Sequence, residues 1–172
     1  MLDLLQAFYT ETFPDRQGPA VTDLTDITAG WESELHAFTL EYGPAAARRR
    51  EELILRLYPG DGAPAKATRE FHNMRLLRAA GYPVPEVYIL ELDRGFGKPF
   101  LIMERIRGQL LGALLTASSE ERQRELLTVF CRLFVRLHEL DWRPFNRGAA
   151  GQAPVRCDGV AVLRPCEVGD AP

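Results

Sequence analysis

The sequence predicts an α+β fold: a mainly antiparallel sheet of about five strands, one helix packed on it, and a long helix that follows. Short apolar stretches with a period of two, separated by Gly- and Pro-containing turns, predict five strands between residues 21 and 106. Two longer stretches with a helical period lie at 64–80 and 118–140. At 172 residues with 46% apolar side chains, the chain can build one ordinary core.

Composition argues against several classes of function. The formal net charge of −3 gives no sign of a nucleic-acid partner, and no apolar run is long enough to span a membrane. Cys131, Cys157 and Cys166 form no CxxC pair and no tight cluster with histidine, so no metal site is predicted. Reduced thiols and an N-terminus unlike a signal peptide lead us to expect a cytoplasmic protein.

The N-terminal part is predicted to be a helix followed by two strands. Residues 2–13 place apolar side chains near a helical period, and PDRQGP ends that helix, so 1–20 forms an N-terminal helix and linker. Residues 21–42 read as two strands around a polar turn at 30–33. The charge run 48–52 is expected to be the solvated end of a loop between strands.

Residues 52–58 form an apolar strand with a cation at its centre. Leu53, Leu55 and Leu57 share one face, whereas Ile54, Arg56 and Tyr58 share the other. Burying an unpaired guanidinium costs more than the packing of one strand returns. Arg56 therefore needs either solvent or an anionic partner.

The helix at 64–80 offers that partner. Pro64 suits its first turn and Gly81 the position past its end, and Glu70 lies at the margin of its apolar stripe. If this helix packs on the sheet, Glu70 can pair with Arg56 and leave part of the guanidinium free for an anion. Taken alone, the pair is better interpreted as a structural salt bridge, since ion-pair networks without a function are common.

The C-terminal half predicts two more strands, a helix and a tail. The strands lie at 86–92 and 100–106, on either side of RGFGKP. The helix at 118–140 carries a broad apolar stripe, and Ser118 with Glu121 fits a capping box. We expect that stripe to be exposed and to cause self-association. Residues 143–172 are rich in Gly and Pro without a period, which predicts an irregular, disordered tail.

Several strings resemble one family. ITAGWESELHAFTL, LILRLYPG, REFHNMRLLRAAGYPVPEVYIL, GKPFLIMERIRGQLL and LFVRLHELDW together are similar to the aminoglycoside phosphotransferase family, whose fold is kinase-like. The resemblance covers about 21–142. It implies that 21–108 is a kinase-like N-lobe that binds nucleotide, and that 109–142 is the segment after the hinge with the first C-lobe helix.

The resemblance also implies site residues and a cofactor, ATP with Mg²⁺. The turn at Gly30 would cover the phosphates, Arg56 would stand where many members have a phosphate-contacting lysine, and Glu70 would hold it. Ile54 would contact the adenine face and Met103 the back of its pocket. The hinge, whose backbone would bind adenine, would consist of Glu104, Arg105 and Ile106, closed by Gly108.

The catalytic string of that family is missing from this sequence. None of His36, His72 and His138 is followed by Gly-Asp, so no catalytic residue and no metal ligand is predicted. A reading frame shifted by one base would permit a family-like continuation, so we expect a truncated or frameshifted relative after about residue 145. The predicted function is an ATP-dependent small-molecule O-phosphotransferase, inactive alone, with an unidentified hydroxyl acceptor. The alternative is a non-catalytic nucleotide-binding or protein-interaction module.

Overall fold

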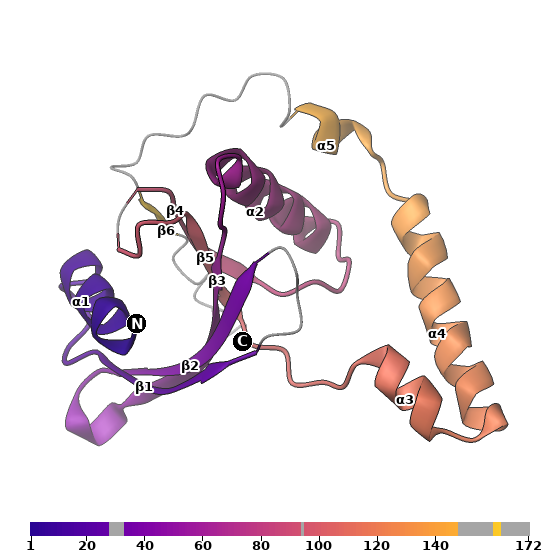
Figure 1. The fold of residues 1–172 in the computed structure, drawn as a ribbon, viewed down its shortest axis with the longest axis horizontal. Coiled ribbons are helices and arrows are strands. Elements are labelled where there is room, and N and C mark those ends of the chain that lie inside the picture. The colour runs from indigo at the N-terminus through magenta and orange to yellow at the C-terminus, as the bar shows by residue number, and fades with distance from the viewer. Residues whose placement is uncertain (28–32, 94, 148–159, 163–172) are drawn as a thin grey trace, which may run out of the picture.

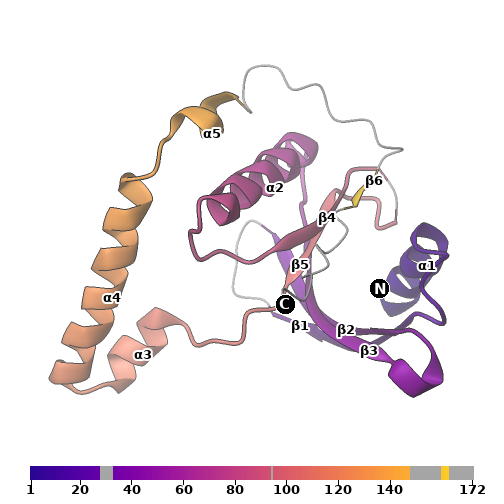
Figure 2. The same ribbon diagram turned by 180° about the vertical axis from the view of Figure 1, so that it is seen from behind.

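The computed structural model describes residues 1–27, 33–93, 95–147 and 160–162. Its strands form one antiparallel sheet in the order β1-β2-β3-β5-β4-β6 (Figures 1 and 2). The strands are β1 (Ala20–Asp26), β2 (Glu34–Tyr42), β3 (Arg49–Leu57), β4 (Val87–Glu91), β5 (Phe100–Glu104) and β6 (Val160–Val162). The predicted α+β class, a five-stranded kinase-like sheet with a packed helix and a long helix after it, is confirmed, and the three-residue β6 extends its edge.

Two helices cover opposite faces of the sheet. Helix α1 (Leu2–Thr12) buries Leu5, Phe8 and Tyr9 in one core cluster, which includes alternate residues of β3 such as Leu55. Helix α2 (Ala63–Ala79) buries Ala67 and Phe71 in a second cluster on the other face. The period of two along β3 separates these clusters, because successive side chains of a strand point to opposite faces. Arg56 is therefore on the α2 face, as the alternation predicts.

The charge run at 48–52 is mostly strand rather than loop, which corrects the expectation. A single 3-10 turn, η1 (Ala45–Ala47), joins β2 to β3, and β3 begins at Arg49. Arg50 pairs in register with Glu41 of β2, and its guanidinium contacts the carboxylates of Glu41 and Asp23. Cross-strand pairs of opposite charge stabilise a solvent-facing strand end, so charged residues extend β3 instead of ending it.

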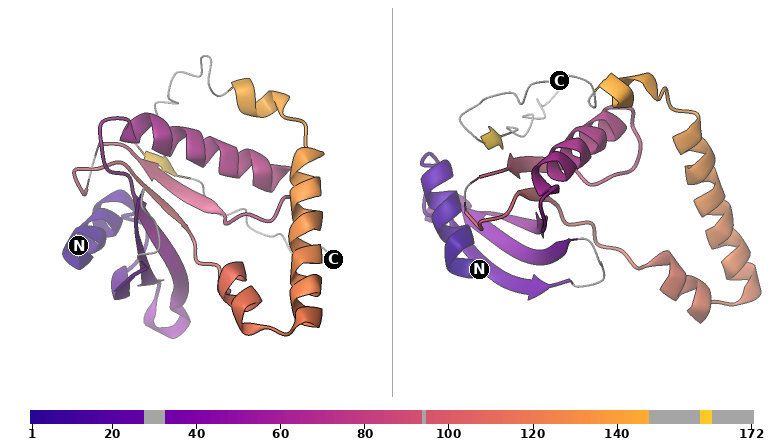
Figure 3. Two further views of the ribbon diagram at one scale, coloured as in Figure 1. Left: turned by 45° about the vertical axis from the view of Figure 1, so that its right-hand side comes forward. Right: turned by 45° about the horizontal axis from the view of Figure 1, so that its top comes forward.

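The remaining helices lie beside the sheet rather than on it (Figure 3). They are α3 (Leu111–Ala117), α4 (Glu120–His138) and α5 (Arg143–Arg147). Helix α4 covers Glu120–His138 instead of the predicted 118–140. Its N-cap is Ser119, not Ser118, and the Ser119 hydroxyl accepts a hydrogen bond from the N–H of Arg122 at 3.5 Å. No helix in the described part of the chain is long and apolar enough to cross a membrane.

Two segments of the predicted irregular tail have regular structure. They are α5, which directly follows α4, and β6, which pairs with β4. The other residues of the tail, 148–159 and 163–172, lie outside the described residues, and so does the predicted turn residue Gly30.

Candidate functional site

The predicted contact between Arg56 and Glu70 is present. Strand β3 holds Arg56 between Leu35 of β2 and Leu101 of β5, at the centre of the sheet. Helix α2 packs Ala67 and Phe71 on the same face, and Glu70 lies between them in sequence. Arg56 Nη1 and Glu70 Oε1 are 2.5 Å apart, and about a quarter of each side chain is exposed. The pair is therefore partly desolvated, which makes it stronger than a surface ion pair.

Tyr58 is a third member of this cluster, and the sequence analysis assigned it no role. Its hydroxyl donates a hydrogen bond to Glu70 Oε2 at 2.8 Å, and its ring centroid lies 5.3 Å from the guanidinium carbon of Arg56. Burial and the neighbouring Glu70 carboxylate raise the pKa of Tyr58 far above its usual value. One signal was available: the period of two places Tyr58 on the same face as Arg56.

Glu70 does not engage all the hydrogen-bond donors of the Arg56 guanidinium. Its Nε is buried and has no hydrogen-bond partner among the described residues. A guanidinium carries five N–H donors, and a buried donor without an acceptor is costly. The Tyr58 hydroxyl occupies one carboxylate oxygen of Glu70 and Arg56 the other, so both oxygens are engaged. The buried Nε is closed to a ligand, whereas the exposed quarter of the Arg56 side chain can meet an additional acceptor, such as an anion.

Ile54 and Met103, the two residues assigned to the adenine pocket, are direct neighbours. They pair across β3 and β5, and Ile54 also pairs with Ala37 of β2. All three belong to the core cluster on the α2 face, and Ile54 and Met103 keep only 9% and 8% of their surface exposed. They form an apolar row across three strands, one step along β3 from Arg56 on the same face. Their nucleotide roles stay predictions.

The predicted hinge has one free N–H group. The N–H of Glu104 donates to the Glu86 carbonyl at 2.8 Å, and the N–H of Arg105 to the Glu52 carbonyl at 3.3 Å. These two donors are therefore used inside the chain. Ile106 is 59% exposed, and its N–H makes no hydrogen bond to another described residue. Of the three hinge donors, only that of Ile106 is left unused by the residues that the structure describes.

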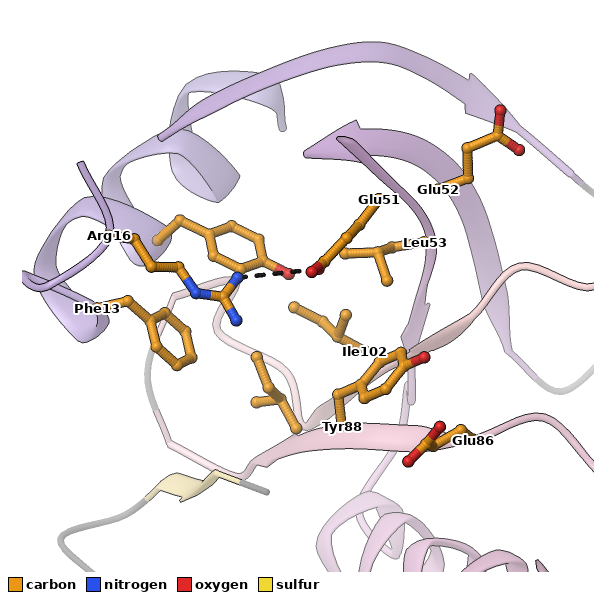
Figure 4. A pocket seen from close by; sticks show the side chains of 10 residues that line it. Phe13, Arg16, Glu51, Glu52, Leu53, Glu86, Tyr88 and Ile102 are labelled. Carbon is orange, nitrogen blue, oxygen red and sulfur yellow. Dashed lines mark ion pairs between the residues drawn. The ribbon is translucent and has the colours of Figure 1, made fainter. Parts of the chain in front are cut away.

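A pocket of about 280 Å³ lies on the opposite, α1 face of the sheet (Figure 4). Its apolar lining includes Leu53, Ile89 and Ile102, and Arg16 stands at its edge with Nη1 4.0 Å from Glu51 Oε2. None of the predicted nucleotide-site residues lines this pocket. It is thus separated from the Arg56 cluster by the full thickness of the sheet.

Metal binding finds no support in the described part of the chain. Within residues 1–27, 33–93, 95–147 and 160–162 there is no group of three or more His, Cys, Asp or Glu side chains that could hold an ion.

Comparison with known proteins connects this geometry to a family. A segment of 93 residues is 27% identical to Acyl-CoA dehydrogenase family member 11 from Gallus gallus. That segment is 54% of this chain but 12% of the relative, so the chain corresponds to a small part of that protein. The model of the phosphotransferase enzyme family, APH, matches residues 23–158, which include β2, β3, α2 and β5. The chain therefore belongs to the phosphotransferase enzyme family.

Proposed function

We propose that this chain binds the phosphates of ATP through Arg56 and forms the nucleotide-binding part of a small-molecule O-phosphotransferase. The observation that carries the proposal is the cluster of Arg56, Glu70 and Tyr58. It holds a central cation in a fixed orientation and leaves about a quarter of the Arg56 side chain exposed to an anion. A strand cation held by a helix carboxylate is the arrangement that positions phosphates in kinases.

The apolar row beside Arg56 supports a purine next to the phosphates. Ala37, Ile54 and Met103 form an apolar row across three adjacent strands, and β5 leads directly from Met103 to the hinge. The free N–H of Ile106 is a suitable donor to a ring nitrogen of adenine. The turn at Gly30 is proposed to cover the phosphates.

The proposal assigns no catalytic residue to this chain. Phosphoryl transfer needs a carboxylate to orient the hydroxyl and further oxygen ligands for Mg²⁺. The sequence has no His-Gly-Asp string, and the described residues offer no metal cluster. We therefore propose binding of ATP by this chain without transfer, with a hydroxyl compound as the acceptor of the family reaction. We keep the cytoplasm as the expected compartment, because the cysteine pattern shows no disulfide framework.

Equilibrium binding to Arg56→Met tests the phosphate contact. Methionine keeps much of the length of arginine but cannot bind an anion. The affinity for ATP should fall at least about tenfold, since a charged hydrogen bond contributes about 1.5–3 kcal/mol. The affinity for adenosine, which has no phosphate, should stay nearly constant. Isothermal titration calorimetry with both ligands measures this difference.

Arg50→Met is the matched control. Arg50 lies on β3 like Arg56, an even number of residues away, so the strand period places it on the same side of the strand. It is exposed and ion-paired, and its substitution removes the same charge. It should bind ATP like the parent chain. Equal losses in both variants would show a general charge effect, and no ATP binding by the parent at millimolar concentration would overturn the proposal.

A further inference from the structure

Helix α4 carries a row of large apolar side chains that nothing in the described structure covers. Their exposed fractions run from 39% for Leu137 to 54% for Val129 and Val135. The helix touches the rest of the chain at both ends. Near its start Gln123 donates to the carbonyls of Leu115 and Ser118. Near its end the Tyr82 hydroxyl donates to the Leu133 carbonyl, and Arg136 donates to the Gly81 carbonyl. A contiguous apolar stripe of this kind marks an interaction surface.

The order of these side chains is symmetric about Arg132. The positions two residues before and after Arg132 are both phenylalanine. The positions three residues away are both valine, and those five residues away are both leucine. The six residues in chain order are Leu127, Val129, Phe130, Phe134, Val135 and Leu137. The two Phe and two Leu have spacings of three, four and three, which places them on one face of the helix. We name these four the α4 stripe.

We propose that the α4 stripe binds the α4 stripe of a second copy of this chain in an antiparallel, two-fold symmetric pair. In such a pair centred on Arg132, a residue n positions before the centre meets the residue n positions after it in the other copy. Phe130 then packs on the partner's Phe134, and Leu127 on the partner's Leu137. Both contacts occur twice because of the two-fold symmetry, so every residue of the α4 stripe packs on a residue of the same type in the other copy.

The helix dipoles favour the same orientation. Helix α4 spans 19 residues, and each helix carries a partial positive charge at its N-terminus and a partial negative charge at its C-terminus. Antiparallel packing aligns the two dipoles in the attractive sense. A parallel pair would instead bring like ends together. The spacing of the stripe is the one used by helices that cross at about 20°.

The size of the contact sets the expected affinity. With the axis at Arg132, residues 126–138 of the two helices overlap over about 20 Å, and burying the stripe would remove on the order of 400 Å² of surface from each copy. A total of about 800 Å² is smaller than the roughly 1,200–2,000 Å² of stable, specific interfaces. We therefore expect a weak dimer that dissociates on dilution. Nothing in this inference depends on nucleotide binding.

Sedimentation equilibrium of the 172-residue chain over a wide concentration range tests the dimer. Phe134→Glu should raise the dissociation constant at least about tenfold, because it puts a carboxylate against the partner's Phe130. Leu110→Glu is the control, since Leu110 is 73% exposed and lies outside α4. A chain that stays monomeric at every concentration, or equal effects of both variants, would overturn the proposal.

Cross-linking tests the orientation and the register. In a chain with Cys157→Ser and Cys166→Ser, the exposed Cys131 remains, one residue from the two-fold axis. Two copies of Cys131 would lie about 3 Å apart along the helix direction, so a short bis-maleimide should link them. In the second chain Cys131→Ser and Arg124→Cys are added. Position 124 lies on the same flank but about 24 Å from its counterpart, and it should not be linked.

These outcomes separate the alternatives. Linking through position 131 without linking through position 124 supports the antiparallel pair. Linking through both positions shows a parallel pair, and linking through neither shows a different interface. Either of these two results would overturn the proposal. Circular dichroism of each variant confirms that the chains compared are equally folded.

Discussion

Replacing Glu70 by glutamine should destabilise the fold through Arg56. The substitution keeps the size of the side chain and an oxygen for the Tyr58 hydroxyl, but it leaves the guanidinium without a counter-charge. Removing one partner of a fully buried pair costs about 3–5 kcal/mol, whereas exposed pairs contribute about 0–1 kcal/mol. Because a quarter of each side chain is exposed, we expect about 2 kcal/mol for Glu70→Gln. For a chain of this length that lowers Tm by about 4–8 °C.

Urea unfolding followed by circular dichroism measures this change, and a double-mutant cycle assigns it to the pair. Arg56→Met, Glu70→Gln and the double variant should show a coupling energy of about 1–2 kcal/mol, since the second substitution removes a charge that the first left unpaired. Glu120 and Arg124 on α4 provide the control pair. Both are more than 75% exposed, and the same cycle there should give only about 0.3–0.5 kcal/mol.

Additivity would refute this reasoning. If the double variant loses the sum of the two single losses within about 0.5 kcal/mol, Arg56 and Glu70 do not interact in solution. The phosphate site would then lose its positioning group. If Glu70→Gln alone lowers the free energy of unfolding by less than about 0.5 kcal/mol, the same conclusion follows.

Two further predictions concern tyrosines. Tyr58→Phe removes the 2.8 Å hydrogen bond to Glu70 and should cost about 1–2 kcal/mol in urea unfolding; an unchanged midpoint would show that the bond contributes nothing. Tyr88 tests the alkaline limb of stability. Burial, together with Glu86, Glu104 and Glu51, raises its pKa to about 12, compared with about 10 in the unfolded chain. Tyr88 therefore stays protonated to a higher pH in the folded state than in the unfolded chain. Its protonation contributes fully to the free energy of unfolding below about pH 10, and this contribution is lost as the pH rises toward 12. Tyr88→Phe should lose less stability between pH 10 and 12 than the parent, and an equal loss would contradict the assignment.

The sequence by itself determined the five main strands, the main helices and which face of the central strand each of its side chains occupies. Alternation along 52–58 separates Leu55 from Arg56 because the period of a strand is two, and that local rule survives in any sheet. The helical period of 64–80, with Pro64 and Gly81 at its ends, likewise specified α2. Even the ion pair of Arg56 with Glu70 followed, since a cation in the middle of an apolar strand requires a partner.

Tertiary structure alone decided the details that depend on contacts between distant segments. The charged residues after Arg48 form strand because β2 supplies partners across the ladder, which local composition does not encode. Tyr58 binds Glu70 because α2 packs at one angle on the sheet, so its role depends on a geometry that no spacing specifies. The free N–H of Ile106 emerged in the same way, once Glu86 and Glu52 had occupied its neighbours. The helical period of α4 could be read from the sequence, but its exposure depends on what the rest of the chain covers, and only the folded arrangement decides that.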